Sequence, residues 1–206
     1  IDESAGAVAE ETEEKPKKSA NQIMETHAPK RPTELKADVI RFTNGTEKWL
    51  AVVGVLNDKP YEIFTGKAED VFNLPNWVQT GAGIKSNSAD GKKRYDFRFT
   101  DKDGYSVTIE GLSRLFDKEF WNYAKLISGV LRHGMPIPHV VDLIGNLSLY
   151  DESINTWKAG VERALKKYIP NGTQGKDRTC SQCGDEGLIY EEGCLKCTSC
   201  GYTKCG

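Results

Sequence analysis

Hydrophobic and polar positions alternate along the first half of the folded part of the chain, a pattern that predicts β-strands. Apolar segments rich in β-branched and aromatic residues are separated by turn residues at Asn44-Gly45, at 57–60 and at Asp101–Gly104. The predicted strands cover residues 39–42, 49–56, 61–64, 95–99 and 105–109. We therefore predict a small antiparallel sheet with one face buried.

From about residue 116 the apolar positions recur at every third or fourth residue, which is the spacing of an amphipathic helix. The predicted helices cover residues 116–131, 140–147 and 153–168. Asp117 is the expected N-cap of the first helix and Gly134 its stop, and Pro170 ends the third. Strands followed by helices predict an α+β fold, here a small antiparallel sheet followed by about three helices.

The N-terminal segment has a different composition. Residues 1–37 contain no Phe, Trp or Tyr, and the first twenty mix carboxylates with lysines. Such a segment buries too little apolar surface to offset its ordering entropy, so we predict a disordered, flexible linker. The predicted organisation is a linker at 1–37, an α+β domain at 38–169, a second linker at 170–178 and a cysteine-rich module at 179–206.

Composition and charge narrow the function classes. The 28 Lys and Arg residues nearly balance 30 Asp and Glu residues, and the net charge of −2 gives no general argument for binding nucleic acid or an anionic membrane. The longest apolar run, Trp49–Leu56, has eight residues, whereas a membrane helix needs about 20. We expect no membrane span. Position 1 is Ile rather than Met, which we interpret as the sign of a fragment or a processed chain.

All the cysteines lie in the last 27 residues of the chain. A secreted disulfide scaffold would spread its bridges through the fold. Clustering of this kind indicates a local metal or redox module in a reducing compartment, which favours a cytoplasmic location. The six are Cys180, Cys183, Cys194, Cys197, Cys200 and Cys205.

Four of these cysteines form two Cys-x-x-Cys hooks, Cys180 with Cys183 and Cys197 with Cys200. Two such hooks can place four thiolates at the corners of a tetrahedron, the geometry that Zn²⁺ prefers. A glycine after each hook permits a tight turn, and the apolar residues 188–190 predict a short strand between the hooks, as a zinc ribbon requires. We predict a zinc site held by these four cysteines, with a redox dithiol or an iron–sulfur site as alternatives.

Cys194 and Cys205 remain outside the two hooks. They are either spare thiols or alternative ligands, since Cys194-x-x-Cys197 is itself a hook, or they form a redox pair, because a small ribbon leaves thiols accessible for exchange. Spacing alone leaves both interpretations open. No Ser/His/Asp set, carboxylate pair or nucleotide fingerprint marks a catalytic centre, and we interpret Gly81–Ser86 as a loop rather than a phosphate-binding loop.

The cysteine-rich segment from Thr179 to Gly206 resembles the C-terminus of adenosylcobalamin-dependent (class II, vitamin B12-dependent) ribonucleotide reductases. The resemblance extends upstream through segments that are similar to the region after the catalytic barrel of that family, and it covers about residues 28–206. These segments read KRPTELKADV from Lys30, PYEIFTG from Pro60, FWNYAKLISGVLR from Phe120 and INTWKAGVERALKKY from Ile154.

The resemblance implies an oxidoreductase role in deoxyribonucleotide biosynthesis for DNA replication, with ribonucleoside diphosphates as substrates. In that family a cobalamin-generated cysteine radical in an α/β barrel reduces the ribonucleotide, and C-terminal cysteines then carry electrons from thioredoxin to the disulfide left in the active site. We expect Cys194 and Cys205 to form this redox relay, with Cys205 as the end that reaches the active site, because it stands at position 205 of 206. The pair Cys200 and Cys205 also resembles the spaced pair of reductase tails.

The barrel, its radical cysteine and the cobalamin contacts are not among the 206 residues. The resemblance therefore implies the C-terminal region of a reductase, non-catalytic by itself. Its expected partners are the catalytic barrel, thioredoxin and further copies of the chain in the full enzyme. Adenosylcobalamin belongs to the barrel, and Zn²⁺ is the cofactor expected in this chain.

The alternative function is a non-redox zinc ribbon that binds protein or nucleic acid. A nucleic-acid ribbon should present a basic, aromatic face. After Cys180 the chain instead has Asp185, Glu186, Glu191 and Glu192 beside only Lys196 and Lys204. This composition disfavours nucleic acid and leaves docking to a protein open.

Overall fold

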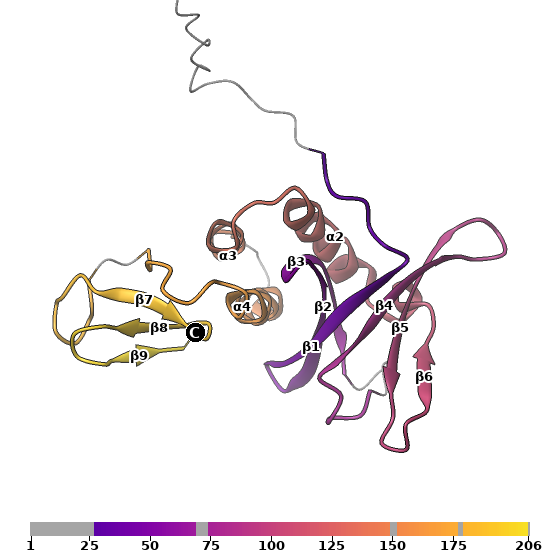
Figure 1. Cartoon of the computed structure of the whole chain (residues 1–206), viewed down its shortest axis with the longest axis horizontal. Helices are drawn as coiled ribbons and strands as arrows, with labels where there is room; N and C mark the ends of the chain where they lie inside the picture. The colour runs from indigo at the N-terminus through magenta and orange to yellow at the C-terminus, as the bar shows by residue number, and fades with distance from the viewer. Residues whose placement is uncertain (1–26, 69–73, 149–151, 177–178, 206) are drawn as a thin grey trace, which may run out of the picture.

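The computed structural model describes residues 27–68, 74–148, 152–176 and 179–205 (Figure 1). A six-stranded sheet with four helices forms the larger part, and a separate three-stranded sheet forms the C-terminal part. The α+β class predicted from the sequence is confirmed. Most of the linker predicted over residues 1–37 lies outside the described residues. The first strand nevertheless begins within that range, at Glu34, and it buries Leu35 and Ala37.

The large sheet is antiparallel throughout, with the strand order β3-β2-β1-β4-β5-β6. Its strands are β1 (Glu34–Asn44), β2 (Glu47–Leu56), β3 (Lys59–Lys67), β4 (Thr80–Asn87), β5 (Lys93–Thr100) and β6 (Ser106–Ile109). The rings of Phe64 on β3 and Tyr95 on β5 lie 5.3 Å apart, although three strands separate β3 from β5 in the sheet. The sheet is therefore strongly curled, and its central strands are buried on both faces.

Strand β4 corrects one prediction. The sequence predicts a loop at Gly81–Ser86, but these residues pair with both β1 and β5, so the prediction is wrong. A β-carbon on Gly81 would lie 2.4 Å from the ring of Phe97 and 2.5 Å from the carbonyl oxygen of Arg98. Glycine is needed where another strand comes this close. Because glycine has no side chain, it interrupts the alternation of apolar and polar residues that predicts a strand.

The helices are α1 (Leu112–Leu115), α2 (Lys118–Arg132), α3 (Ile137–Gly145) and α4 (Glu152–Lys166). The last three are the helices that the apolar spacing predicts, whereas α1 is a single turn that the sequence did not reveal. The side chain of Asp117 accepts a hydrogen bond from the backbone N–H of Glu119, as expected for an N-cap. None of the helices in the described ranges is long and apolar enough to cross a membrane.

Each face of the sheet has its own hydrophobic core. One core joins β1–β3 to α2, α3 and α4 and includes Trp49 and Trp157, both 1% exposed. The other lies on the opposite face, where Leu50 and Phe97 meet α1. Helix α2 contributes Ile127 to the first core and packs Trp121 against the second. It therefore closes the curl of the sheet beside β3.

Close packing of α4 on β1 leads to a prediction about two helical glycines. A β-carbon on Gly160 of α4 would lie 2.1 Å from the buried ring of Phe42, whereas one on Gly129 of α2 would meet nothing within 4 Å. Alanine favours helix over glycine, so Gly129→Ala should raise the free energy of unfolding by about 0.5–1 kcal/mol. Gly160→Ala should lower it by about 1–3 kcal/mol through overpacking. Urea unfolding measures both values, and shifts of the same sign would contradict this packing.

A buried ion pair ties the segment before β1 to the sheet. The guanidinium of Arg31 donates to both carboxylate oxygens of Glu62 on β3, at 2.8 and 2.6 Å, and to the carbonyl oxygen of Gly83 on β4 at 3.1 Å. The two side chains are only 6% and 1% exposed. The pair therefore connects strands that lie far apart in the sheet order.

Candidate functional site

The C-terminal part, called the ribbon below (residues 179–205), is a three-stranded antiparallel sheet. Its strands are β7 (Leu188–Glu191), β8 (Cys194–Cys197) and β9 (Thr203–Lys204), in that order. The two residues between β7 and β8, Glu192 and Gly193, have φ values of 51° and 81°. Positive φ at both central positions is the mark of a type I′ hairpin turn. The sheet brings the two Cys-x-x-Cys hooks to one end and this hairpin to the other.

The two hooks have the same backbone hydrogen bonds. Cys180 donates its N–H to the carbonyl oxygen of Asp185, and Cys197 donates to Tyr202, both at 2.8 Å. Each hook ends in a glycine, Gly184 or Gly201, whose N–H donates back to the first cysteine of the hook and whose φ is near 75°. Only glycine adopts this conformation without strain. Both hooks therefore fold into equivalent knuckles.

The knuckles bring four thiols together. The Sγ atoms of Cys180, Cys183, Cys197 and Cys200 all lie within 4.8 Å of one another. The distance is 3.7 Å between Cys180 and Cys200, and also 3.7 Å between Cys183 and Cys197. A tetrahedral zinc ion with Zn–S bonds of about 2.3 Å separates its sulfurs by about 3.8 Å. The cluster therefore has the size and donor set that Zn²⁺ requires.

The four thiols are coupled electrostatically. The backbone amides of Cys200 and Ser199 lower the pKa of the Cys197 thiol to about 7. At Cys183 the amide of Asp185 lowers the pKa, but the Cys200 thiol, desolvation and the remaining thiols outweigh it and raise the pKa to about 12. The protein alone thus favours one thiolate and resists another. A dication held by the four sulfurs would favour the thiolate form of all of them, because coordinating thiols are deprotonated.

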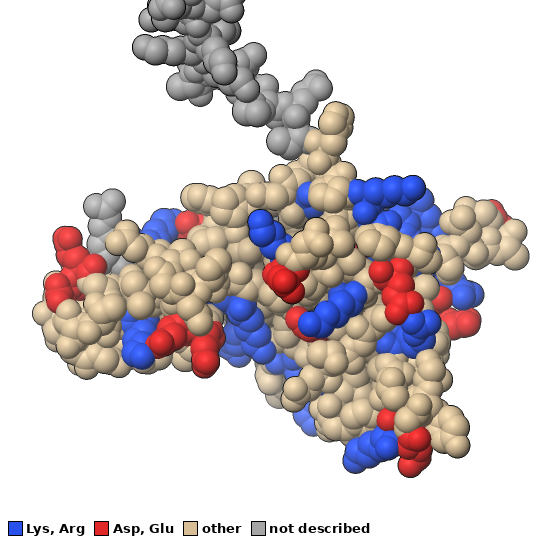
Figure 2. Space-filling view, in the orientation of Figure 1, with Lys and Arg blue, Asp and Glu red and all other residues tan. Residues whose placement is uncertain are grey.

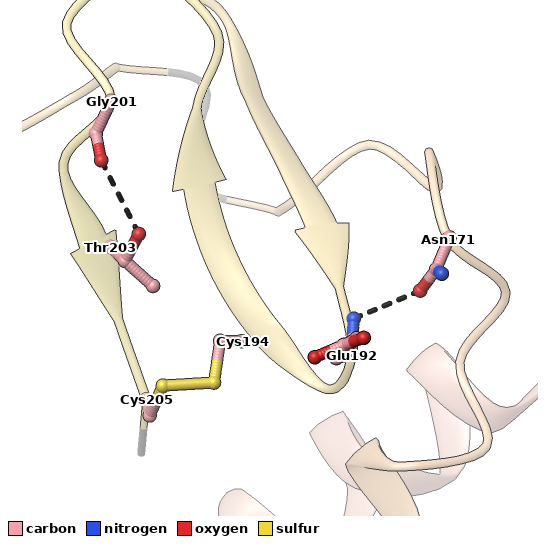
Figure 3. Close-up of a disulfide and its surroundings, with 6 residues drawn as sticks. All are labelled: Asn171, Glu192, Cys194, Gly201, Thr203 and Cys205. Atoms are coloured by element: carbon pink, nitrogen blue, oxygen red, sulfur yellow. Dashed lines mark hydrogen bonds between the residues drawn. A yellow bond between two sulfur atoms is a disulfide. The ribbon is translucent and has the colours of Figure 1, made fainter.

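Cys194 and Cys205 form a disulfide at the hairpin end of the ribbon (Figure 3). The bond joins the first residue of β8 to the residue after β9, with the Cα atoms 4.4 Å apart. Cys205 is exposed and Cys194 is half-buried. Spacing alone left open whether Cys194, Cys200 or Cys205 belongs with the metal ligands. The structure places Cys200 in the four-thiol cluster and links Cys194 to Cys205 by a disulfide.

The hairpin end of the ribbon rests on the helical layer (Figure 1). Gly193 lies against the C-terminal end of α4, where a β-carbon would be 3.2 Å from the carbonyl of Lys166. Tyr190 of β7 packs against the core between the large sheet and the helices. The side chain of Asn171 accepts a hydrogen bond from the N–H of Glu192 at 2.9 Å (Figure 3). The disulfide therefore sits near the junction of the two parts.

Residues 170–178 were predicted as a linker, and their described part is hydrogen-bonded to the ribbon. Thr173 accepts from the N–H of Tyr190, while Gly172 and Gly175 donate to carbonyl oxygens of β7 at 2.8 and 2.9 Å. This segment has no apolar alternation, so its sequence does not indicate pairing with a strand. The role of Asn171 could not be predicted from the sequence either, because an asparagine after a helix-ending proline is typical of an ordinary turn.

A family model described as the NrdJ homologue C-terminal domain matches residues 35–170. This range covers the large sheet and the helices and ends where the segment leading to the ribbon begins. No curated protein and no solved structure matches the chain.

Proposed function

Because the chain belongs to the family of NrdJ homologue C-terminal domains, we propose that its ribbon carries reducing equivalents to the active site of a ribonucleotide reductase. The family supports an association with ribonucleotide reductase, an oxidoreductase. The relay, its source of electrons in thioredoxin and its target in a cobalamin-dependent barrel are our proposal. The barrel lies outside these residues, and the chain alone is non-catalytic. Its place of action is the cytoplasm, where thiols are kept reduced.

The observation that carries the proposal is the Cys194–Cys205 disulfide, with Cys205 exposed, at the opposite end of the ribbon from the four-thiol cluster. Cys205 follows β9, which is held to β8 by two register pairs, Leu195 with Lys204 and Lys196 with Thr203. Once the disulfide is reduced, only this short ladder holds Cys205 against the ribbon. The residue is then held by few interactions and can move to reach a partner's disulfide.

Electrons pass through two thiol–disulfide exchanges. In the first, a thioredoxin thiolate attacks Sγ of Cys205, and Cys194 leaves as a thiolate. The second thioredoxin thiolate then displaces Cys205, so thioredoxin is oxidised and the pair gains two electrons and two protons. In the second exchange, the Cys205 thiolate attacks the disulfide of the barrel. Cys194 resolves the mixed disulfide, the barrel receives the two electrons and two protons, and the Cys194–Cys205 bond is restored.

Zinc in the four-cysteine cluster has a structural role in this proposal. Cys180 and Cys197 are 2% and 1% exposed, so two of the ligands are closed to a reductant. All four positions are protein thiolates, which is typical of structural zinc sites rather than catalytic ones. The metal holds the two knuckles together, and thereby holds the strand that carries Cys194.

Cys205→Ser in the full reductase tests the relay. We expect the variant to lose turnover driven by thioredoxin and to keep turnover driven by dithiothreitol, a small thiol that enters the active site directly. Cys194→Ser should behave in the same way, because the mixed disulfide can then not be resolved. Ser181→Ala, an exposed change in the same ribbon, is the control and should leave both activities unchanged.

Full thioredoxin-driven turnover in both cysteine variants would remove these residues from the relay. The ribbon would then be a non-redox module that docks onto a protein, which is the alternative function. Pull-down of the barrel by the chain with all six cysteines intact, compared with Cys205→Ser, separates docking from electron transfer. The proposed relay expects equal docking by both.

A further inference from the structure

A cavity of about 380 Å³ lies between helix α2 and the hairpin formed by β4 and β5. The helix contributes residues with the spacing of a single face, namely Trp121, Lys125, Ser128 and Arg132. The hairpin contributes Lys85 and Tyr95, which are paired directly across the two strands, so their side chains share one face of the sheet. The cavity is therefore built by regular elements and not by loops.

The lining of this cavity is cationic. Lys85, Lys93, Lys125 and Arg132 line it, together with neutral residues and no Asp or Glu. Among the described residues, none of these four cations forms an ion pair with a carboxylate. Figure 2 shows Lys and Arg side chains gathered at the upper right, between α2 and the β4–β5 hairpin. Four positive charges thus converge on one cavity, and none of the described Asp and Glu residues lines it.

The buried carboxylate of Glu62, which acts electrostatically on Lys85, is already paired with another cation. Both oxygens of Glu62 are engaged by Arg31, whose guanidinium lies 5.8 Å from the ring centre of Tyr95. Desolvation and the charges of Lys93, Arg31 and Arg132 together lower the pKa of Lys85, against an opposing effect of Glu62. The buried Nε of Arg132 has no hydrogen-bond partner among the residues that the structure describes. A bound anion would neutralise these cations and could accept a hydrogen bond from the unpaired donor.

Aromatic rings form another side of the cavity. Phe64, Tyr95 and Trp121 line it. The rings of Phe64 and Trp121 are stacked, with centroids 4.8 Å apart and planes 15° from parallel, which fixes the orientation of the indole. Trp121 is half-buried, so part of its surface faces the cavity. A planar group attached to an anion has a surface to stack against.

We propose that this cavity binds an oligophosphate, that is, two or three linked phosphate groups, either free or as part of a nucleotide. A single phosphate carries at most two charges and reaches one or two cations, whereas a triphosphate spreads several charges over a few ångströms and matches four cations from three elements. The fork of an Arg side chain and the point charges of lysines are both common phosphate ligands. The site is distinct from the ribbon, and its existence does not depend on the redox relay.

Titration calorimetry of the full chain with inorganic tripolyphosphate tests the proposal. We expect saturable binding of one ligand per chain. The test variant replaces two exposed cavity lysines, Lys93→Gln with Lys125→Gln, and should bind at least about tenfold more weakly, since each hydrogen bond to a charged group is worth about a factor of ten or more. The control variant, Lys102→Gln with Lys118→Gln, removes the same charge from exposed positions outside the cavity and should bind as the natural chain does.

Adenosine triphosphate distinguishes the two sources of the phosphate groups. Equal affinities for tripolyphosphate and for the nucleotide support recognition of free oligophosphate. Tighter binding of the nucleotide, with the excess lost in Trp121→Leu, supports a nucleotide whose base stacks on the indole. Equal weakening in the test and control variants, hexaglutamate binding as tightly as tripolyphosphate, or no saturable binding to either phosphate ligand would each overturn the proposal.

Discussion

Removing metal from the chain should unfold the ribbon and leave the six-stranded sheet intact. The buried core of the ribbon consists of Cys180, Leu188 and Cys197, with Tyr202 packed against it. So few side chains cannot offset the conformational entropy of the segment. A structural zinc ion contributes about 10–16 kcal/mol of apparent binding free energy in zinc-finger peptides, which is enough to decide whether such a module folds.

The sequence provides separate reporters for the two parts. All four tryptophans precede the ribbon, so their fluorescence reports mainly on the sheet and the helices. Amide exchange of residues 179–205 reports on the ribbon. With a strong chelator we expect tryptophan fluorescence far from that of the unfolded chain, loss of exchange protection in the ribbon and about one zinc released per chain. Purified chain without metal, together with a ribbon that stays protected under chelation, would contradict the zinc assignment.

Breaking the ion pair between Arg31 and Glu62 should cause the second large loss of stability. Arg31→Met leaves the Glu62 carboxylate 1% exposed and without its cation. Removing one partner of a buried pair costs about 3–5 kcal/mol, because the other charge stays buried and uncompensated. Chemical unfolding followed by tryptophan fluorescence measures this loss at neutral pH.

Two further variants separate the buried charge from the change of size. Arg31→Met combined with Glu62→Leu removes both charges and should recover most of the lost stability, since apolar replacements of buried pairs are often neutral. Lys92 and Asp90 form an exposed ion pair, with side chains 84% and 56% exposed. Lys92→Met breaks this pair and should change the free energy of unfolding by at most about 1 kcal/mol. A double variant as unstable as Arg31→Met alone would rule out the buried charge as the cause.

The pair also illustrates what the sequence could not reveal. Arg31 precedes the first strand in a segment without aromatic residues, and its partner is 31 positions away. No local spacing connects two such residues. The Asp117 N-cap and the two knuckles are different, because the groups that interact are at most five residues apart. Chemistry that depends on local spacing was predictable, and chemistry that depends on the curl of the sheet was not.

The cysteines fall on both sides of this division. Each hook is local, and its spacing predicts which thiols could converge. The partner of Cys205 is not determined by spacing, because Cys194 and Cys200 both lie within reach along the chain. The pairing of β8 with β9 decides between them, since it brings residue 205 beside the start of β8. The sequence also did not predict that Lys85 and Lys125 line one cavity. Lys85 lies on β4, a strand that the sequence pattern does not predict, and Lys125 lies on the distant helix α2.

Strand β8 separates a disulfide cysteine, Cys194, from a cysteine of the four-thiol cluster, Cys197. Cys194 and Cys197 are its first and last residues, three positions apart, so their side chains point to opposite sides of the strand. Six unprotected thiols in so short a segment could be joined in many wrong combinations. If a metal ion holds four of them, oxidation has a single product, the Cys194–Cys205 bond. The ion would then act as a protecting group, and the tail could be oxidised and reduced through many cycles without scrambling.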